Sequence, residues 1–261
     1  MATGSRQPVT DPDADRASVV VVVPTYNECS NIETLVHGVL AQGPRYRVLI
    51  VDDGSPDGTG ELADALAVAH PDRVEVIHHA AKGGLGPAYI AGFRRALELA
   101  PDIIAQMDAD LSHDPAALPQ LVAAARQADL VLGSRYIAGG RIAGWSFWRR
   151  LLSRMGGAYA RVVLGAPIAD LTSGFKVWRP NTLASIESDR LRSDGYGFTI
   201  EATWRALRRG ATVAEVPIIF TDRVAGASKL SRRIVFEAAV LVWKLRWEAR
   251  SPSRRSMSCD Q

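Results

Sequence analysis

The sequence predicts an α/β domain built on a doubly wound, mostly parallel β-sheet. Through the first half of the chain, short β-branched runs alternate with segments of helical period. The runs are continuously apolar, which indicates strands buried on both faces, and strands that alternate with helices are joined by right-handed crossovers. In such sheets ligands bind outside the carboxyl ends of the strands, so functional residues are expected in the loops that follow them.

The elements are expected in the following order. The first strand is a run of valines and the later strands are similar runs of Val, Ile and Leu: Val19–Val23, Val48–Val51, Val74–Ile77, Ile103–Met107 and Leu130–Leu132. Apolar residues at helical spacing predict helices between them, near 31–41, 59–69, 87–99 and 116–127. The second half adds an amphipathic stretch at Trp145–Leu164, an apolar run at Val213–Phe220 and a late amphipathic helix that reaches Trp247.

The composition is that of a folded domain. The 261 residues are 47% hydrophobic and 23% charged, which excludes disorder for most of the chain. No linker interrupts residues 18–248, so we expect one domain there, with a disordered segment at 1–17 and a disordered basic tail at 249–261. With only two cysteines and no Cys/His metal spacing, a reducing compartment is expected. The sequence predicts neither a signal peptide nor a transmembrane helix.

The net charge of +3 hides an asymmetry. From Arg223 to Gln261 the chain has nine Lys or Arg and three acidic residues, a charge of +6, which leaves −3 for the first 222 residues. An anionic partner is therefore expected at the basic end. Charge alone leaves phosphate, nucleic acid and a membrane surface open.

Acidic residues gather in the loops after the first, second and fourth expected strands. Asp114 precedes Pro115 as a helix N-cap, and Asp57 belongs to a Ser-Pro-Asp-Gly turn, so both are assigned to structure. Asp108 and Asp110 come too early to cap that helix, and two carboxylates this close repel each other unless a cation lies between them. Mg²⁺ or Mn²⁺ takes one or two carboxylates and adds water and phosphate oxygens, so this pair predicts a divalent metal site.

The Gly-rich segment Lys82–Gly86 suggests a phosphate loop, but the match fails in detail. It lacks the Gly-Lys-Ser/Thr ending of a Walker loop, and Tyr89 stands where a dinucleotide fingerprint has Gly or Ala. A plain tight turn and a loop that approaches the ligand by its backbone both stay open. No nucleophile motif accompanies the five histidines, which argues against a catalytic triad.

Cations lie in Gly-containing loops of the second half. Arg135 follows the fifth strand in Gly-Ser-Arg-Tyr, and Arg223 and Lys229 lie in the loop after Val213–Phe220. Arg presents a two-pronged donor and Lys a point charge, and both suit phosphate. These three residues are therefore predicted to bind phosphate.

Five motifs occur in a fixed order. They are Val-Pro-Thr-Tyr-Asn-Glu from Val23, Asp-Asp-Gly-Ser-Pro-Asp-Gly-Thr from Asp52, Met-Asp-Ala-Asp-Leu-Ser-His from Met107, Gly-Ser-Arg-Tyr from Gly133 and Asp-Arg-Val-x-Gly-x-Ser-Lys-Leu from Asp222. With this set the chain resembles the dolichol-phosphate and polyprenol-phosphate mannose synthases, in their bacterial branch, over about residues 18–245. The resemblance implies an inverting glycosyltransferase of GT-A fold.

The resemblance also implies a role for each matching residue. One group would cradle the donor nucleotide: Pro24, Tyr26, Glu28, Val51 and Asp53. A second would hold the sugar, the diphosphate and the metal: Asp108, Ala109, Asp110 and Ser112. A third would hold the leaving diphosphate and the phosphate of the acceptor: Arg135, Arg149, Arg223 and Lys229. The catalytic groups among them would be Asp108, Asp110, Arg135, Arg223 and Lys229, with Asp110 the most direct metal ligand.

The implied reaction is attack of a polyprenyl (dolichyl-type) monophosphate on C1 of GDP-mannose, which gives polyprenyl phosphate β-mannose. Mg²⁺ or Mn²⁺ and nearby cations would stabilise the leaving nucleoside diphosphate. A phosphate monoester is already ionised near neutral pH, so no general base is required. Transfer of glucose from UDP-glucose to the same lipid is the alternative. A nucleic-acid partner is disfavoured, because clustered Asp residues repel phosphates.

A lipid acceptor implies contact with a membrane surface. Large apolar residues gather in two segments: Trp145, Phe147, Trp148, Leu151 and Leu152 in one, and Val240, Leu241, Trp243, Leu245 and Trp247 in the other. Lys244, Arg246 and Arg250 flank the second segment. Such helices lie in the membrane interface, with core packing as the alternative for the later one. We therefore expect a cytoplasmic protein, peripheral on the inner face of the plasma membrane, with or without a separate transmembrane partner.

Overall fold

The structure is a computed structural model that describes residues 17–188, 191, 193, 195–222 and 240–247. Two predicted site residues, Arg223 and Lys229, lie outside the described residues. So do residues 1–16 and 248–261, which make up nearly all of the two segments predicted to be disordered.

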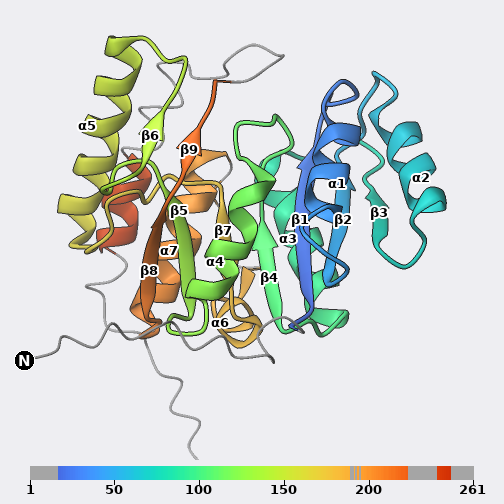
Figure 1. Cartoon of the computed structure of the whole chain (residues 1–261). Coiled ribbons are helices and arrows are strands. Elements are labelled where there is room, and N and C mark those ends of the chain that lie inside the picture. The colour runs from blue at the N-terminus through green and yellow to red at the C-terminus, as the bar shows by residue number, and fades with distance from the viewer. Residues whose placement is uncertain (1–16, 189–190, 192, 194, 223–239, 248–261) are drawn as a thin grey trace, which may run out of the picture.

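Within the described part of the chain, seven strands form one sheet in the order β3-β2-β1-β4-β7-β5-β8, and β6 pairs with β9 in a second sheet (Figure 1). The strands are β1 Val19–Thr25, β2 Tyr46–Asp52, β3 Val74–His78, β4 Ile103–Gln106, β5 Leu130–Ser134, β6 Arg141–Ile142, β7 Lys176–Trp178, β8 Val213–Pro217 and β9 Ile219–Phe220. The helices are α1 Ile32–Leu40, α2 Thr59–Ala69, α3 Leu85–Glu98, α4 Leu118–Ala124, α5 Phe147–Leu164, α6 Pro180–Ser185 and α7 Tyr196–Arg208.

The predicted fold class is confirmed, and all five expected strands form. The sheet departs from the prediction in β7, which lies between β4 and β5 and runs antiparallel to both. With Lys176 in its three residues, β7 gives no apolar run that a periodicity argument would detect. The run Val213–Phe220 also divides, because Pro217 has no N–H to continue the sheet ladder and ends β8.

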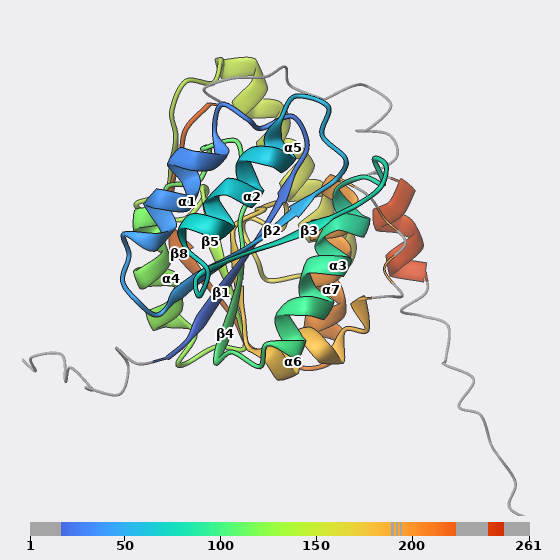
Figure 2. The ribbon, with the colours of Figure 1, turned by 90° about the vertical axis from the view of Figure 1, so that its right-hand side faces the viewer.

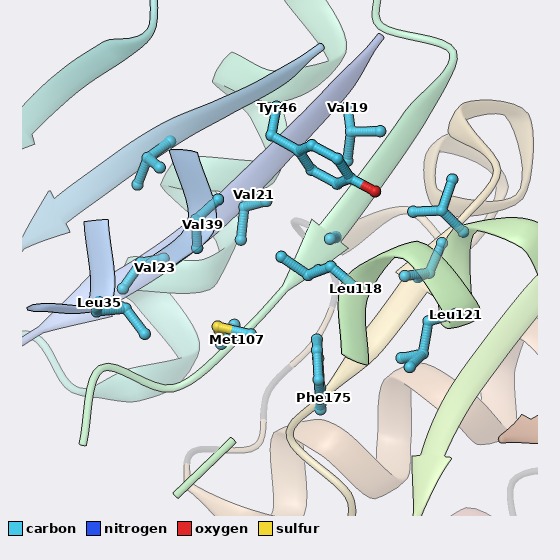
Figure 3. Close-up of a cluster of buried hydrophobic side chains, with 14 of the residues drawn as sticks. Val19, Val21, Val23, Leu35, Val39, Tyr46, Met107, Leu118, Leu121 and Phe175 are labelled. Carbon is cyan, nitrogen blue, oxygen red and sulfur yellow. The ribbon is translucent and has the colours of Figure 1, made fainter. Parts of the chain in front are cut away.

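Helices cover both faces of the sheet. In Figure 2, α1, α2 and α4 lie on one side, and α3, α6, α7 and the helix 240–247 lie on the other. The valines of β1 divide between the two cores: Val19, Val21 and Val23 face the first layer (Figure 3), and Val20 and Val22 face the second. This two-sided burial is what the continuous apolar runs predicted.

Two amphipathic helices lie at the β8 end of the sheet. Helix α5 starts at the N-cap Ser146, whose hydroxyl accepts a hydrogen bond from the Arg149 N–H, and it ends at Gly165 in a left-handed conformation. The helix 240–247 buries Val242 and Leu245 in the core. Among the described helices, none has both the length and the apolar character that crossing a bilayer requires.

Candidate active site

The candidate site lies where the carboxyl ends of β2, β1 and β4 meet. These strands are parallel neighbours in the sheet, so their following loops emerge side by side. The loop after β1 contains Tyr26 and Glu28, the loop after β2 contains Asp53, and the loop after β4 contains Asp108 and Asp110. The topology therefore brings together the acidic residues that the sequence singled out.

The loop after β1 is fixed to the loop after β2 by backbone donors. The Asn27 N–H donates to Ser55 Oγ at 3.0 Å, and the Glu28 N–H donates to Thr59 Oγ1 at 2.9 Å. Asn27 takes a positive φ of 62°, a conformation that Asn tolerates better than most residues. Asp57 accepts from the Thr59 N–H at 3.1 Å, which confirms its predicted structural role.

Asp53 organises the Gly-rich turn after β3. Its carboxylate accepts hydrogen bonds from the Gly83 and Gly84 N–H groups at 2.8–3.0 Å and lies 2.9 Å from His79 Nδ1. Burial opposes ionisation of Asp53, but the bonds from Gly83, His79 and Gly84 outweigh it and lower its pKa. An internal carboxylate thus occupies the donors that a phosphate loop would offer. The turn also places Lys82 Nζ 3.7 Å from the centre of the Tyr26 ring.

The loop after β4 folds into a tight turn around its second carboxylate. Asp110 accepts a hydrogen bond from the Ser112 N–H at 3.0 Å, and Leu111 between them has a φ of 59°. A left-handed Leu is uncommon and is held here by its surroundings. Thr221 helps to fix this turn, since its N–H donates to the Ser112 carbonyl and its hydroxyl donates to the Leu111 carbonyl. The segment after β9 therefore lies directly beside the acidic loop.

Asp108 is enclosed on several sides although its side chain is 34% exposed. The Tyr89 hydroxyl donates to Asp108 Oδ1 at 3.1 Å, and His113 Nδ1 lies 3.9 Å from Oδ2. Gly174 comes so close that a Cβ added to it would lie 2.6 Å from Oδ2. Burial raises the pKa of Tyr89 well above its ordinary value, and the Asp108 charge adds to the effect, so the hydroxyl stays protonated and donates.

The residues of this loop suit a hard divalent cation. Asp108 and Asp110 provide carboxylates, and the buried Ser112 hydroxyl has no hydrogen-bond partner among the described residues. Within that same part of the chain, no three His, Cys, Asp or Glu side chains come together as a metal cage. A site with few protein ligands leaves positions for water and substrate phosphate, as Mg²⁺ prefers. The donor set therefore fits Mg²⁺ or Mn²⁺ bound together with a diphosphate.

Arg135 follows β5 and is held in a buried ion pair that the sequence did not reveal. Its Nε and Nη2 each donate to Asp170 at 2.7 Å, and Nη2 also donates to Thr172 Oγ1 at 2.8 Å. Asp170 is fully buried, at 0% exposure. The signal that could have found it is the segment Asp170–Gly174, whose Asp, Thr, Ser and Gly resemble the other loops of this edge in composition.

Arg149 lies at the start of α5 and reaches the end of β9. Its Nη1 donates to both carboxylate oxygens of Asp222, at 2.9 and 3.0 Å, and its guanidinium carbon lies 4.1 Å from the centre of the Trp145 ring. Asp222 is the residue before Arg223 in the chain. Thr221 thus contacts the acidic loop, and Asp222 follows it at the end of the described segment, directly before the predicted phosphate-binding residue Arg223 in the sequence.

Other predicted residues lie below the surface of this edge. Pro24 and Val51 are register partners on β1 and β2, and Ala109 is 4% exposed. The Val51 side chain packs in the α3-side core, where Gly92 approaches it. Asp114 accepts from the Ala116 N–H at 2.9 Å and caps the 3₁₀ turn before α4, which confirms its structural assignment.

Comparison with known proteins assigns the sequence of this chain to a family. The family model described as glycosyl transferase family 2 matches residues 20–183. An undecaprenyl-phosphate mannosyltransferase of Micrococcus luteus is 45% identical over 234 residues, which cover 88% of this chain and 96% of the relative. A polyprenol monophosphomannose synthase of Mycolicibacterium smegmatis is 45% identical over 230 residues, 87% of each chain.

Solved structures show the same fold at lower identity. The glucosyl-3-phosphoglycerate synthase of Mycobacterium tuberculosis in complex with Mn²⁺, UDP and glucosyl-3-phosphoglycerate superposes with a TM-score of 0.64 at 20% identity, over 95% of this chain and 86% of that one. Its complex with Mg²⁺ and UDP gives a TM-score of 0.64 at 20% identity, over 92% and 84% of the two chains. The match to the family model, together with the two relatives at 45% identity, shows that this chain belongs to glycosyl transferase family 2.

Proposed function

We propose that the protein is a metal-dependent mannosyltransferase that moves mannose from GDP-mannose to a polyprenyl monophosphate with inversion, giving polyprenyl phosphate β-mannose. The observation that carries the proposal is the 45% identity, over 87–88% of the chain, to relatives named as an undecaprenyl-phosphate mannosyltransferase and a polyprenol monophosphomannose synthase. The acidic loop at the sheet edge supports it independently, because a departing diphosphate needs such a cation site.

In this proposal the loops after β1 and β2 bind the donor nucleotide. Tyr26 and Glu28 are partly exposed at the edge, while Asp53 acts from beneath by fixing the Gly83–Gly84 turn. The same turn holds Lys82 against Tyr26, so a cation lies on the nucleotide side of the site. Pro24 and Val51 support these loops from the ends of their strands.

Transfer breaks the bond from C1 of mannose to the diphosphate and forms a bond from C1 to the acceptor phosphate on the opposite face. Asp108, Asp110 and Ser112, beside Ala109, would hold the Mg²⁺ or Mn²⁺ whose chemistry is to neutralise the leaving diphosphate. Cations of the chain add to this at the phosphates: Arg135, Arg149, Arg223 and Lys229. The acceptor phosphate needs no general base, since it is already ionised near neutral pH.

The acceptor lipid would be reached from a membrane surface through α5. Large apolar side chains of α5 recur at helical spacing and are exposed, among them Trp148, Leu152, Met155 and Val162 at 74%, 47%, 60% and 75%. Arg150, Arg154 and Arg161 lie on the same helix and are also exposed. An exposed apolar face beside cations is the composition of a helix that lies in an anionic membrane interface. We propose peripheral attachment to the inner face of the plasma membrane, with or without a transmembrane partner protein.

Parts of the expected membrane surface are corrected by the structure. Trp145 precedes α5 and packs against the Phe220 ring, with centroids 5.4 Å apart, so it does not belong to the exposed face. In the later helix Leu245 is 5% exposed, whereas Trp243 and Trp247 are 57% and 77% exposed. That helix therefore combines core packing with an outer face that can extend the surface of α5.

A transfer assay tests the proposed function. Purified protein receives GDP-mannose and UDP-glucose together with a short polyprenyl phosphate, with and without Mg²⁺ or Mn²⁺, and the labelled lipid products are separated. We expect mannosyl lipid only when metal is present, and the Asp110→Ala variant should lose this product. Glucosyl lipid as the main product would support the alternative donor, UDP-glucose. No lipid product with either donor would contradict the assignment.

A further inference from the structure

Tyr89 reaches the candidate site from the face of the sheet that α3 and α7 cover. It lies on α3 and is fully buried, and its ring stacks on Phe198 with centroids 5.5 Å apart and an interplanar angle of 5°. Phe93 stacks on the same ring at 5.5 Å. Aromatic packing therefore fixes where the ring lies, without help from the hydroxyl.

The hydroxyl points at one oxygen of a carboxylate whose other oxygen is confined separately. Tyr89 Oη donates to Asp108 Oδ1 at 3.1 Å, while Gly174 and His113 lie beside Oδ2. A hydrogen bond to an ionised acceptor is among the stronger kinds, and here it selects one orientation of the carboxylate. Asp108 is thus hydrogen-bonded at Oδ1 and has little room to move at Oδ2, although a third of its side chain is exposed.

We propose that Tyr89 is a positioning residue, whose hydroxyl holds the Asp108 carboxylate in the orientation that binds the divalent cation of the donor complex. The inference rests on the proposed function, which assigns Asp108 to that cation. Tyr89 itself touches neither metal nor substrate in this role. It acts through Asp108. The stack with Phe93 and Phe198 fixes the Tyr89 ring, and the ring fixes the hydroxyl that orients Asp108 before the cation binds.

The position of α3 connects this role to donor binding. The helix begins directly after the turn whose Gly83 and Gly84 N–H groups are held by Asp53. One helix is therefore fixed at its start by the carboxylate of the nucleotide side and contacts, one turn later, the carboxylate of the metal side. The bonds from Asp53 hold the start of α3 without the Tyr89 hydroxyl, whereas the hydroxyl contacts Asp108 directly. Loss of the hydroxyl should therefore change metal affinity more than nucleotide affinity.

The test removes the hydroxyl and keeps the ring. The full-length Tyr89→Phe variant is titrated with Mn²⁺ in the presence of GDP by electron paramagnetic resonance, and GDP binding without metal is measured by calorimetry. We expect Mn²⁺ affinity about tenfold weaker, as for loss of a hydrogen bond to a charged group, with metal-free GDP affinity unchanged. Tyr46→Phe is the matched control, because it removes a buried hydroxyl at the opposite end of β2 and should leave both affinities unchanged.

Asp108→Asn separates this inference from the proposed function. If Asp108→Asn weakens Mn²⁺ binding and Tyr89→Phe does not, the positioning role is wrong and the metal assignment stands. If Asp108→Asn leaves Mn²⁺ binding intact, both fail. In the double variant, Tyr89→Phe should add little to the effect of Asp108→Asn, because both act through one carboxylate. Full additivity in Mn²⁺ affinity would show that Tyr89 acts elsewhere and would overturn the inference.

Discussion

Arg135 and Asp170 form a two-point ion pair in which both side chains are buried, at 5% and 0% exposure. The pair joins the loop after β5 to the loop before β7, and the Arg135 backbone N–H also donates to Asp170 at 3.0 Å. This second loop contains Gly174, which abuts Asp108. The Arg135–Asp170 pair therefore fixes the loop that forms one wall of the proposed metal site.

Removing Asp170 should destabilise the whole protein. Asp170→Ala leaves a buried guanidinium without its counter-charge, and loss of one partner of a buried pair costs about 3–5 kcal/mol in the free energy of unfolding. Urea denaturation followed by circular dichroism measures the change. Asp222→Ala is the control, because the Arg149–Asp222 pair is partly exposed and such pairs contribute about 1 kcal/mol or less. Equal losses in the two variants would contradict the prediction.

Gly174→Ala should impair transfer through Asp108. The added Cβ would lie 2.6 Å from Asp108 Oδ2, so the carboxylate has to move from its place between Tyr89 and His113. A misplacement on the order of 1 Å can cost about a hundredfold in rate, and we expect kcat/KM for transfer to fall by at least tenfold.

A second glycine provides the control for this substitution. A Cβ on Gly156 in α5 meets no atom within 4 Å, so Gly156→Ala should leave transfer unchanged. It should also stabilise the protein by about 0.5–1 kcal/mol, because Ala favours the helix over Gly. Wild-type activity in Gly174→Ala would show that the position of Asp108 tolerates this contact.

The sequence predicts those parts of the fold that depend on continuous local patterns. The valines of β1 and the neighbouring apolar runs are visible because both of their faces are buried, and Asp57 and Asp114 are recognisable because caps and turns have local residue preferences. Asp108 and Asp110 stand out for a different reason, since both come too early to cap the helix that follows, although Asp110 also accepts a hydrogen bond from the Ser112 N–H in the folded loop.

Residues that act over long sequence separations could not be predicted in this way. In the sequence, Tyr89 is distinguished only by breaking a dinucleotide fingerprint, yet in the structure its hydroxyl donates a hydrogen bond to Asp108. Asp170 is 35 residues from Arg135 in the chain, and nothing local links the two. Lys176 breaks the apolar pattern of β7 because α7 supplies partners for its ammonium group. Each of these contacts depends on how distant segments pack.

The buried Lys176 predicts that stability rises with pH. Burial lowers the pKa of Lys176 from 10.5 to about 7, against the opposing charges of Asp170 and Asp108. An unfolded chain keeps the ordinary lysine pKa, so between about pH 7 and pH 10.5 the unfolded state binds more protons than the folded state. This group should therefore add up to about 1.4 kcal/mol of stability per pH unit as pH rises through that window.

Lys176→Met isolates this contribution. Thr203 Oγ1 also donates to the Thr199 carbonyl at 2.9 Å, so that carbonyl keeps a partner when the lysine is gone. Unfolding free energies measured by urea from pH 6.5 to 9 should increase more steeply in the wild type than in Lys176→Met. Lys244→Met, at an exposed lysine, should keep the wild-type slope. Parallel curves for wild type and Lys176→Met would rule out a depressed lysine pKa.

The exposed face of α5 predicts binding to anionic vesicles. Trp148 and Leu152 are one helical turn apart, and burial of each in a membrane interface should contribute about 1.5–3 kcal/mol. Trp148→Glu combined with Leu152→Glu should therefore weaken binding by at least tenfold in a flotation assay with vesicles that contain phosphatidylglycerol. High salt should weaken wild-type binding as well, because exposed arginines act through screened charge.

Val68→Glu is the matched control for this surface. Val68 is 82% exposed on α2, a helix that packs on the other layer of the sheet, so the same charge there should leave flotation unchanged. Any exposed apolar side chain adds some affinity for lipid, so this control distinguishes binding through the exposed face of α5 from nonspecific hydrophobic binding. If Val68→Glu and the α5 variant lose binding equally, α5 is not the membrane surface. If the wild-type protein does not float with the vesicles, the acceptor lipid reaches the site by another route.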